Sequence, residues 1–401
     1  MRKIAHIGDA HWGLGYPGPS PESRFQDIDR IMQKAADTII AEKCDLVLFA
    51  GDAFKDSKVY IDRASVEIRA FAKWLRRFSD AGIPVVAISG TPSHDALPGY
   101  DLIREMGIPG VHVVTSPEIV EAGGFSIGCL PGLNRSGLLC REDWQDVSVT
   151  EVHAEMSRVL LDMARAFSSQ GAQILLSHLS IEGSDRGFDD LLMLHEPILP
   201  REVLGLFDIT CLGHIHIPQE IPFNVVSLSE QGTQSSCRRG FYCGSPERLS
   251  FNDESVDTGF WIHYDDWKTS QFISTDSRNY VTIRLDEGSD IEEVMASTNL
   301  KDAIVRVQGE LSPQTDISKF KRTMGSRIYD AGAFWLAGIH VSVPAIQERG
   351  RAPEVVGTLH PLTALEKWCH AQKIPSTETE SLRSIVQEYL EEKNTIREVC
   401  C

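Results

Sequence analysis

The chain lacks an excess of basic residues. Its 401 residues include 57 Asp and Glu against 39 Lys and Arg, which gives a formal net charge of −18. Proteins that bind nucleic acid by themselves usually carry basic patches, because neutralising phosphates supplies much of the affinity. The charge balance therefore argues against a lone nucleic-acid-binding module, unless divalent ions or a partner protein supply positive charge.

Long apolar segments are also missing. No stretch approaches the ~20 apolar residues that a membrane-spanning helix needs. The chain begins MRKIAHIGDAH, which enters a strand-like run without the apolar region of a secretory signal. From these features we expect no membrane association and a cytoplasmic location.

Regular cysteine spacing is absent as well. No CxxC pair occurs, which argues against a zinc knuckle. An odd number of scattered cysteines is typical of free thiols in a reducing compartment. The nine cysteines are Cys44, Cys129, Cys140, Cys211, Cys237, Cys243, Cys369, Cys400 and Cys401.

Strands and helices alternate over the first two-thirds of the chain. Apolar residues at helical spacing predict helices over 25–40, 71–78 and 150–167, between β-rich runs such as DLVLFA and PVVAIS. This alternation is typical of a layered α/β domain. From about residue 221 the predicted elements are short strands: PFNVVSL, GFYCG and TGFWIHY.

Composition divides the chain into three segments. A polar stretch over 268–279 suggests that a first domain, 1–275, ends there. Residues 280–343 read strand, helix, strand, helix, strand, which predicts a small α+β domain over 276–345. The remainder, 346–401, is a linker followed by two helices at 361–372 and 377–394. The apolar face of the last helix fits either core packing or the docking of a partner.

Histidine and aspartate clusters follow five of the predicted strands. Strand ends converge on one edge of an open α/β sheet, where such folds place their sites. Imidazoles and carboxylates together suit Mn, Fe or Zn, and so many of them favour a two-metal centre. The clusters are Asp9-Ala10-His11, Gly51-Asp52, Ser93-His94-Asp95, Ser177-His178 and Gly213-His214-Ile215-His216.

The spacing within each cluster suggests how ions are held. Asp9 and His11, two residues apart on an extended strand, would point to the same side and hold one ion. His214 and His216 share that spacing, so they can face one site or straddle two. The carboxylate of Asp52 is the candidate bridge between two ions.

The remaining cluster residues fit the chemistry of phosphoester hydrolysis. His178 would complete the set of ligands around the second ion, and metal-activated water would attack phosphorus in line. His94, oriented by Asp95, is the candidate general acid for the leaving alkoxide. A lone DxH or HxH is more often accidental, so the ordered combination carries this hypothesis. The other histidines are assigned structural or surface roles: His6, His112, His153, His195, His263, His340, His360 and His370.

Taken in order, DAH, GDAF, SHD, SHLS and GHIH resemble the signature of calcineurin-like metallophosphoesterases. FYCGSPERLSF (241–251) and DAIVRVQGEL (302–311) are similar to stretches of SbcD-type DNA exonucleases. Those proteins are the nuclease subunits of the SbcCD-type double-strand-break repair complex. The resemblance covers most of residues 1–345. It implies a four-layer αββα metallophosphoesterase sandwich over 1–275, a DNA-binding capping domain over 276–345 and a candidate ATPase-binding segment in the terminal helices.

The resemblance also implies the site and its partners. Carried over by position, one Mn²⁺ is held by Asp9, His11, Asp52 and His216, and the other by Asp52, His178 and His214, with Mg²⁺ as an alternative. His94 is the implied catalytic histidine. The implied activity is 3′-to-5′ exonuclease and endonuclease cleavage of DNA, in a homodimer driven by an SbcC-like coiled-coil ABC ATPase. That ATPase and the capping domain would share the DNA contacts, which eases the difficulty of the acidic charge.

One departure concerns the third cluster. The family carries GNHD there, and its asparagine binds the second metal. Here the run is Gly90-Thr91-Pro92-Ser93-His94-Asp95, two residues longer and without asparagine. Ser93 is the assigned substitute ligand. Thr91, or a water held by either hydroxyl, is the alternative, and the second metal is expected to bind weakly or exchange readily.

Two basic residues are candidate substrate contacts. Lys55 stands three residues after Asp52, where relatives often carry a histidine near the substrate phosphate. It fits a phosphate clamp or a solvated surface lysine equally well. Arg248, within GSPERLSF, could contact DNA, but an arginine between Glu247 and Leu249 more often locks a loop, and we favour that role.

Two other functions stay open. One is a phosphatase or phosphodiesterase acting on proteins or small molecules, although a single-domain phosphatase has no need of residues 280–400. The other is a catalytically weak assembly subunit that has lost the second metal through the altered loop. The other ligands are nearly all present, whereas a decaying site would be expected to lose several.

Overall fold

The computed structural model describes residues 1–57, 65–93, 95–133, 149–187, 196–229, 232–286, 291–343 and 360–399. The chain divides into two compact units. The first comprises Met1–Leu285, Ser289–Gln308 and Ser318–His340, and the second Asp286–Gly288, Gly309–Ile317 and Val341–Cys401. The domain limits inferred from composition, at 275/276 and 345/346, stay predictions.

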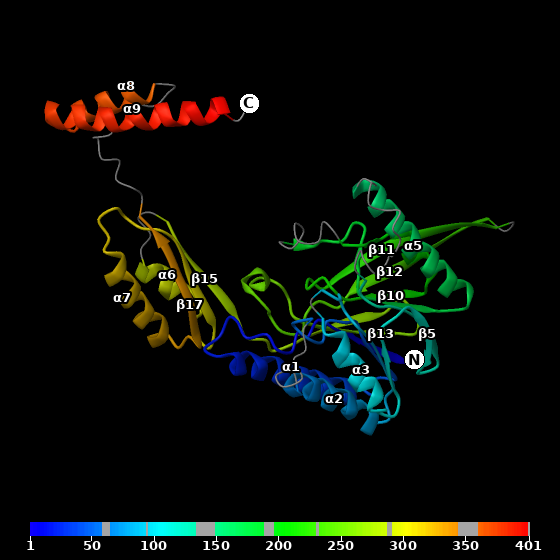
Figure 1. The fold of residues 1–401 in the computed structure, drawn as a ribbon. Helices are drawn as coiled ribbons and strands as arrows, with labels where there is room; N and C mark the ends of the chain where they lie inside the picture. The colour runs from blue at the N-terminus through cyan, green and yellow to red at the C-terminus, as the bar shows by residue number, and fades with distance from the viewer. Residues whose placement is uncertain are drawn as a thin grey trace. The chain divides into compact units, whose positions relative to one another are not determined.

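Two six-stranded sheets form the body of the first unit (Figure 1). The first sheet has the order β14-β13-β1-β2-β3-β4, and its strands β1 to β4 are parallel whereas β13 runs antiparallel to β1. The strands are β14 (Ser270–Ser274), β13 (Gly259–Tyr264), β1 (Lys3–Ile7), β2 (Leu46–Phe49), β3 (Val85–Ile88) and β4 (Val111–Val114).

The second sheet has the order β11-β12-β10-β7-β6-β5. Its central strands β12, β10, β7 and β6 are parallel, and the two edge strands are antiparallel to their neighbours. The strands are β11 (Gln219–Ser229), β12 (Gly232–Tyr242), β10 (Ile209–Leu212), β7 (Ile174–Ser177), β6 (Phe125–Leu130) and β5 (Glu118–Ala122).

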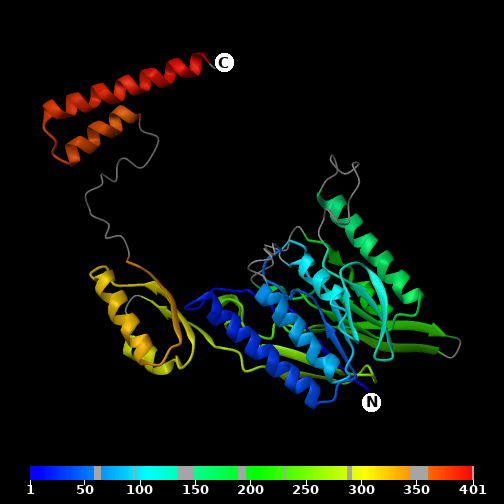
Figure 2. The ribbon, with the colours of Figure 1, turned by 60° about the horizontal axis from the view of Figure 1, so that its bottom comes forward.

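Side-chain alternation along the strands explains the layers. In β2, Val47 and Phe49 join an outer core with helices α1 (Pro21–Ala41), α2 (Ser65–Asp80) and α3 (Leu97–Glu105). Leu46 and Leu48 face the opposite way, into a core shared with the second sheet. The far face of that sheet packs against α5 (Val149–Ser169) and the 3-10 helix η3 (Arg201–Leu206), as Figure 2 shows from a second side. The predicted four-layer αββα sandwich is confirmed.

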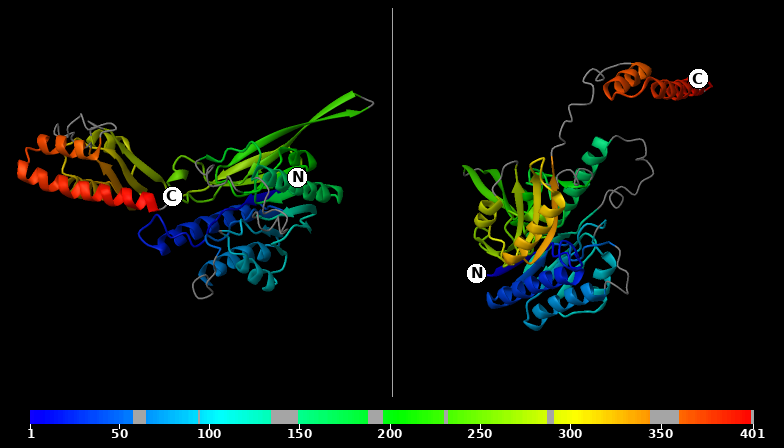
Figure 3. Two further views of the ribbon diagram at one scale, coloured as in Figure 1. Left: turned by 45° about the horizontal axis from the view of Figure 1, so that its top comes forward. Right: turned by 90° about the vertical axis from the view of Figure 1, so that its left-hand side faces the viewer.

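A smaller sheet follows in the sequence, with the order β15-β16-β17. Its strands are β15 (Tyr280–Leu285), β16 (Ile304–Glu310) and β17 (Trp335–Ser342), and the helices between them are α6 (Ile291–Ser297) and α7 (Ile317–Asp330) (Figure 3). Met324 and Ile328 of α7 are buried. The predicted order of strand, helix, strand, helix, strand is confirmed.

Buried charge connects this sheet to helix α1. Arg24 is wholly buried, and its guanidinium donates to Asp27 at 2.8 Å and to the Arg248 carbonyl at 2.7 Å. Arg278, just before β15, donates to both carboxylate oxygens of Asp27 at 3.0 and 2.8 Å. Paired in this way, the buried charges avoid the desolvation cost of isolated ions and fix where the chain leaves the sandwich.

Two helices end the described chain. They are α8 (Pro361–Ala371) and α9 (Ser376–Val399), joined by an ion pair of 2.8 Å between Glu366 and Arg383. Both predicted terminal helices are thus confirmed. Among the helices that the structure describes, none has the length and apolar character that crossing a membrane would need.

Candidate metal centre

Four of the five predicted clusters come together where strands of the two sheets end. Asp9 and His11 follow β1, Asp52 follows β2, His178 follows β7, and the pair His214 and His216 follows β10. Within the described residues, two groups formed by these clusters have ligand atoms that all lie within 4.8 Å of one another. One is Asp9, His11 and His216; the other is Asp9, Asp52 and His178.

The Asp52 carboxylate lies between the two groups. Its Oδ2 atom is 3.6 Å from His11 Nε2, and its Oδ1 atom is 3.2 Å from His178 Nε2. Each oxygen therefore faces a histidine of a different group. This is the arrangement that a bridging carboxylate needs.

The route by which Asp9 and His11 reach the site differs from the prediction. They do not alternate along an extended strand, because β1 ends at Ile7 and both residues have left-handed backbone, with φ of 51° and 49°. Asp52 and His214 share this feature, with φ of 49° and 93°. Each such residue costs roughly 1–3 kcal/mol, and clustered strain of this kind is typical of functional sites.

Glycines leave room for the ligands. A Cβ at Gly90 would lie 1.7 Å from Asp52 Oδ1, and one at Gly51 would lie 2.4 Å from His178 Nδ1. A Cβ at Gly213 would lie 2.1 Å from the Ala50 carbonyl oxygen. The backbone therefore approaches the carboxylate and imidazole groups more closely than any side chain would allow.

The ring of His178 is held so that its Nε2 atom faces the candidate metal centre. Its Nδ1 lies 2.6 Å from the Ala50 carbonyl oxygen, which indicates that this nitrogen carries the proton and donates. Nε2 is buried, and the Asp52 Oδ1 atom lies 3.2 Å from it. A buried imidazole nitrogen that faces a buried carboxylate, with a second buried carboxylate nearby, fits a divalent cation.

The electrostatics of the pocket agree with that fit. Burial by itself lowers the pKa of His178, but the carboxylates of Asp52 and Asp9 outweigh burial and raise this pKa to about 10. Burial raises the pKa of Asp9, although the imidazoles of His178 and His216 act in the opposite direction. The buried carboxylates therefore favour a positive charge beside them, which a proton on His178 or a bound cation can supply.

His214 lies beside the groups and has a carboxylate partner of its own. Its Nε2 is 2.6 Å from Oε2 of Glu196, and its Nδ1 is 3.5 Å from the hydroxyl of Thr91. The Thr91 backbone N–H donates to Asp52 Oδ1 at 3.1 Å. Sequence reasoning missed Glu196, because it belongs to no motif and stands far from every cluster in the sequence.

In the loop that replaces GNHD, the buried hydroxyl nearest the centre belongs to Thr91, whereas Ser93 is exposed. His94 lies outside the described residues. Asp95 is wholly buried and accepts backbone N–H groups from Phe54 at 3.1 Å, Gly90 at 2.7 Å and Ala96 at 2.9 Å. Burial, and then the charge of Asp52, raises the pKa of Asp95 to about 7. The contacts show Asp95 as an anchor of this loop.

The two candidate substrate residues have different surroundings. Lys55 is half-buried, and its backbone N–H donates to the Trp12 carbonyl at 3.1 Å. The Arg248 guanidinium donates to the Ser277 hydroxyl at 2.7 Å and to the carbonyls of Asp253 and Val256, both at 3.2 Å. These bonds tie the GSPERLSF segment to the residues before β15, which agrees with the favoured role of Arg248 as a loop lock.

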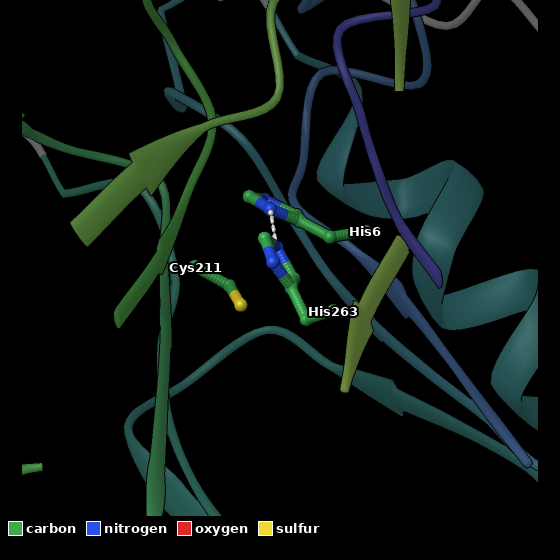
Figure 4. Close-up of side chains that lie close together, drawn as sticks. All are labelled: His6, Cys211 and His263. Carbon is green, nitrogen blue, oxygen red and sulfur yellow. Dashed lines mark hydrogen bonds between the residues drawn. The ribbon is translucent and has the colours of Figure 1, made fainter. Parts of the chain in front are cut away.

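A third histidine group lies in the core between the sheets (Figure 4). His263 Nδ1 is 2.9 Å from the Ser270 hydroxyl, His263 Nε2 is 3.3 Å from His6 Nδ1, and His6 Nε2 is 3.1 Å from the Leu212 carbonyl. Burial lowers the pKa of His6 to about 3 and that of His263 well below its usual value. Each ring nitrogen has a partner when both rings are neutral. Although Cys211 is close by, the pair needs no ion.

Comparison with known proteins decides the family. The model of the calcineurin-like phosphoesterase family matches residues 2–218, more than half of the chain. This chain belongs to the calcineurin-like phosphoesterases. The match includes all four clusters that the structure brings together, so the family resemblance inferred from DAH, GDAF, SHD, SHLS and GHIH is confirmed.

Two relatives of this phosphoesterase are DNA double-strand break repair proteins named Mre11. The protein from Aeropyrum pernix is 27% identical over 235 residues, which are 55% of this chain and 50% of the relative. The protein from Haloferax volcanii is 27% identical over 257 residues, or 63% and 47%. The chain thus spans about half the length of the curated relatives it matches. Among solved structures, a dimetal phosphatase from Danio rerio is similar at 12% identity and a TM-score of 0.33, covering 66% of this chain and 92% of that one.

Proposed function

We propose that this phosphoesterase is a two-metal-dependent DNA nuclease of the SbcD type, which hydrolyses phosphodiesters at DNA ends or breaks. The observation that carries the two-metal part is the position of Asp52, whose oxygens face His11 and His178 at 3.6 and 3.2 Å. Similarity to two proteins of DNA double-strand break repair supports DNA as the substrate.

In this proposal the first ion is held by Asp9, His11, Asp52 and His216, and the second by Asp52, His178 and His214. The ions would be Mn²⁺, with Mg²⁺ as the alternative. When bound, they supply a hydroxide near neutral pH and stabilise the charge that develops on phosphoryl oxygens. Thr91 also supports the second site, because its hydroxyl faces His214 and its amide holds Asp52.

The chain's own residues supply the remaining steps. His94, the proposed general acid, follows Ser93 in the loop that Asp95 anchors through its three backbone contacts. Protonation of the leaving alkoxide by an imidazole would prevent its return to phosphorus. Lys55 is the proposed phosphate clamp, whereas Arg248 acts through the loop that it holds.

A cavity of about 250 Å³ supports a contact with single-stranded DNA. At its wall, the Arg306 guanidinium lies 4.3 Å from the centre of the Phe251 ring. A cationic group stacked on an aromatic ring, with amides and a further aromatic ring nearby, suits one unstacked base. The lining residues are Tyr16, Ser250, Phe251, Asn252, Arg306, Gln308, Ala337 and His340.

The partners belong to the proposal as well. An SbcC-like coiled-coil ABC ATPase would bind the terminal helices and provide the positive surface that a chain of net charge −18 lacks. The working particle would contain two copies of the nuclease. Exonuclease cleavage from 3′ to 5′ and endonuclease cleavage are the activities that we expect from it.

The test is digestion of end-labelled duplex and single-stranded DNA with Mn²⁺, Mg²⁺ or EDTA, beside bis-p-nitrophenyl phosphate. Wild-type protein should degrade DNA only with metal, and Asp52→Asn should lose both bound ions and this activity. Asp257→Asn removes a carboxylate from an exposed position and should behave as wild type. Hydrolysis of the small ester without DNA cleavage would favour the phosphatase function. No hydrolysis by a chain that binds fewer than two ions would favour the assembly subunit.

A further inference from the structure

Glu196 reaches the metal centre through a short two-stranded sheet. Strand β8 (Ser180–Ile181) begins two residues after His178 and pairs in parallel with β9 (Ile198–Leu199), with Ser180 opposite Ile198. Glu196 stands two residues before Ile198, just as His178 stands two residues before Ser180. A carboxylate distant from every cluster in the sequence is thereby delivered to the second predicted metal site.

The contact of Glu196 is specific to one nitrogen of His214. Oε2 of Glu196 is 2.6 Å from Nε2, while Nδ1 of the same ring faces the Thr91 hydroxyl at 3.5 Å. Thr91 in turn donates its backbone N–H to Asp52 Oδ1 at 3.1 Å. The second nitrogen of His214 therefore points toward the side of the centre where Asp52 lies.

We propose that Glu196 is a positioning residue for the second metal ion. Its carboxylate accepts the Nε2–H of His214, which fixes the tautomer and turns the lone pair of Nδ1 toward the ion. Carboxylates commonly orient metal-binding imidazoles in this way. This inference rests on the proposed two-metal function and deepens it.

The altered loop explains why such support matters here. The GTPSHD run has no asparagine, so the second site would lack the amide ligand that the resemblance to the family implies. A site with fewer ligands depends more on how rigidly each remaining one is held. The His214 side chain is 5% exposed and that of Glu196 is 26% exposed, so the pair is shielded more than an ordinary surface ion pair.

The experiment is a Mn²⁺ titration of the full chain by calorimetry, with free Mn²⁺ followed by electron paramagnetic resonance. We expect Glu196→Ala to lower the affinity for the second ion about 10- to 100-fold and to leave the affinity for the first ion unchanged. Glu196→Gln retains an acceptor oxygen and should recover most of this affinity. Glu182→Gln, an exposed carboxylate next to β8, is the matched control and should bind both ions as wild type does.

Each other outcome overturns the positioning role in a recognisable way. If the Ala and Gln variants lost the same affinity for the second ion, the negative charge of Glu196 would be what attracts the ion. Unchanged or tighter second-ion binding in Glu196→Ala would show that Glu196 does nothing for the ion or competes with it. Equal weakening of both ions would indicate a general structural defect. If wild-type protein binds only one ion, the two-metal proposal fails as well, and that result is visible before any variant is compared.

Discussion

At the scale of single residues, the centre depends on backbone atoms that lie very close to ligands. Gly90 shows this most sharply, because a Cβ there would stand 1.7 Å from Asp52 Oδ1 and 2.5 Å from the Asp52 backbone nitrogen. The neighbour is a buried carboxylate on a strained turn, which has no space to move aside. Position 90 therefore requires glycine, because any side chain there would overlap the Asp52 carboxylate.

Gly90→Ala should displace the Asp52 carboxylate and reduce Mn²⁺ affinity at both sites by at least about 100-fold, with a folding cost of about 1–3 kcal/mol for the overpacked methyl group. Calorimetric titration measures the first effect and urea unfolding the second. Gly325→Ala is the control. Gly325 lies within helix α7, and a Cβ there would be at an ordinary contact distance of 3.5 Å from Leu336. It should stabilise the protein by about 0.5–1 kcal/mol and leave metal binding intact. Two ions bound with wild-type affinity by Gly90→Ala would refute the argument.

The convergence of the candidate ligand residues could be predicted from the sequence, but their neighbours could not. Asp9, Asp52, His178 and His214 each follow an apolar run, so their convergence follows from strand ends meeting at an edge. Glu196 carries no such signal, because only the folded chain brings it to His214. The strained turns were also unpredictable, since the residue type of an Asp or His does not reveal whether its backbone is left-handed or extended.

At the scale of elements, the two sheets are joined by a polar contact inside an apolar core. His6 of β1 and His263 of β13 belong to the first sheet, and the Leu212 carbonyl belongs to β10 of the second. The chain of hydrogen bonds runs from Ser270 through both rings to that carbonyl. It holds the end of β10 one residue before Gly213, where the polypeptide turns toward His214.

This contact should make the folded state sensitive to acid. The native pKa of His6 is about 3, and that of His263 is also lowered, whereas an unfolded histidine has a pKa near about 6.5. As the pH falls below about 6.5, His6 and His263 bind protons in the unfolded state but stay neutral in the native state. The stability that these two histidines contribute is thus fully present above about pH 6.5 and decreases toward pH 3, by up to about 1.4 kcal/mol per pH unit for each histidine.

Urea unfolding with EDTA between pH 7.5 and 4.5 measures that slope. His6→Gln keeps a donor for the Leu212 carbonyl but cannot titrate, so its stability should fall less steeply with acid than that of wild type. His112 is exposed, and His112→Gln should leave the slope unchanged. If His6→Gln and wild type lose stability equally between pH 6.5 and 4.5, the buried pair is not the source of the acid sensitivity.

Elements were predictable in proportion to their length and periodicity. The helices over 25–40, 71–78 and 150–167 are found as α1, α2 and α5, because each carries a long apolar stripe. Helix α3 and strands β4 to β6 were missed, since polar residues or glycine interrupt the apolar pattern of these short elements. The polar run from Gly232 to Arg239 was missed as part of β12, because pairing with β11 rather than apolar pattern makes it a strand.

At the scale of the whole molecule, the terminal helices present apolar side chains to solvent. Ile385 and Tyr389 lie one helical turn apart on α9 and are 63% and 58% exposed, and Trp368 of α8 is 44% exposed. Helix α9 carries the predicted apolar face, and its residues Ile385 and Tyr389 are exposed in the single chain. An exposed apolar helix face of this kind is typical of docking to a groove on a partner.

We therefore expect the double substitution Ile385→Ser and Tyr389→Ser to weaken binding to the proposed SbcC-like ATPase by more than about tenfold, as loss of two apolar anchors usually does. Co-purification of the two full-length proteins, followed by a binding titration, measures this. Metal affinity and unfolding of the phosphoesterase domain should not change, because neither residue belongs to the sandwich. Glu380→Gln alters an exposed residue of the same helix and should bind normally. An unchanged Kd for the double variant, with helix content retained, would mean that the ATPase binds elsewhere and that the exposed face of α9 has another partner.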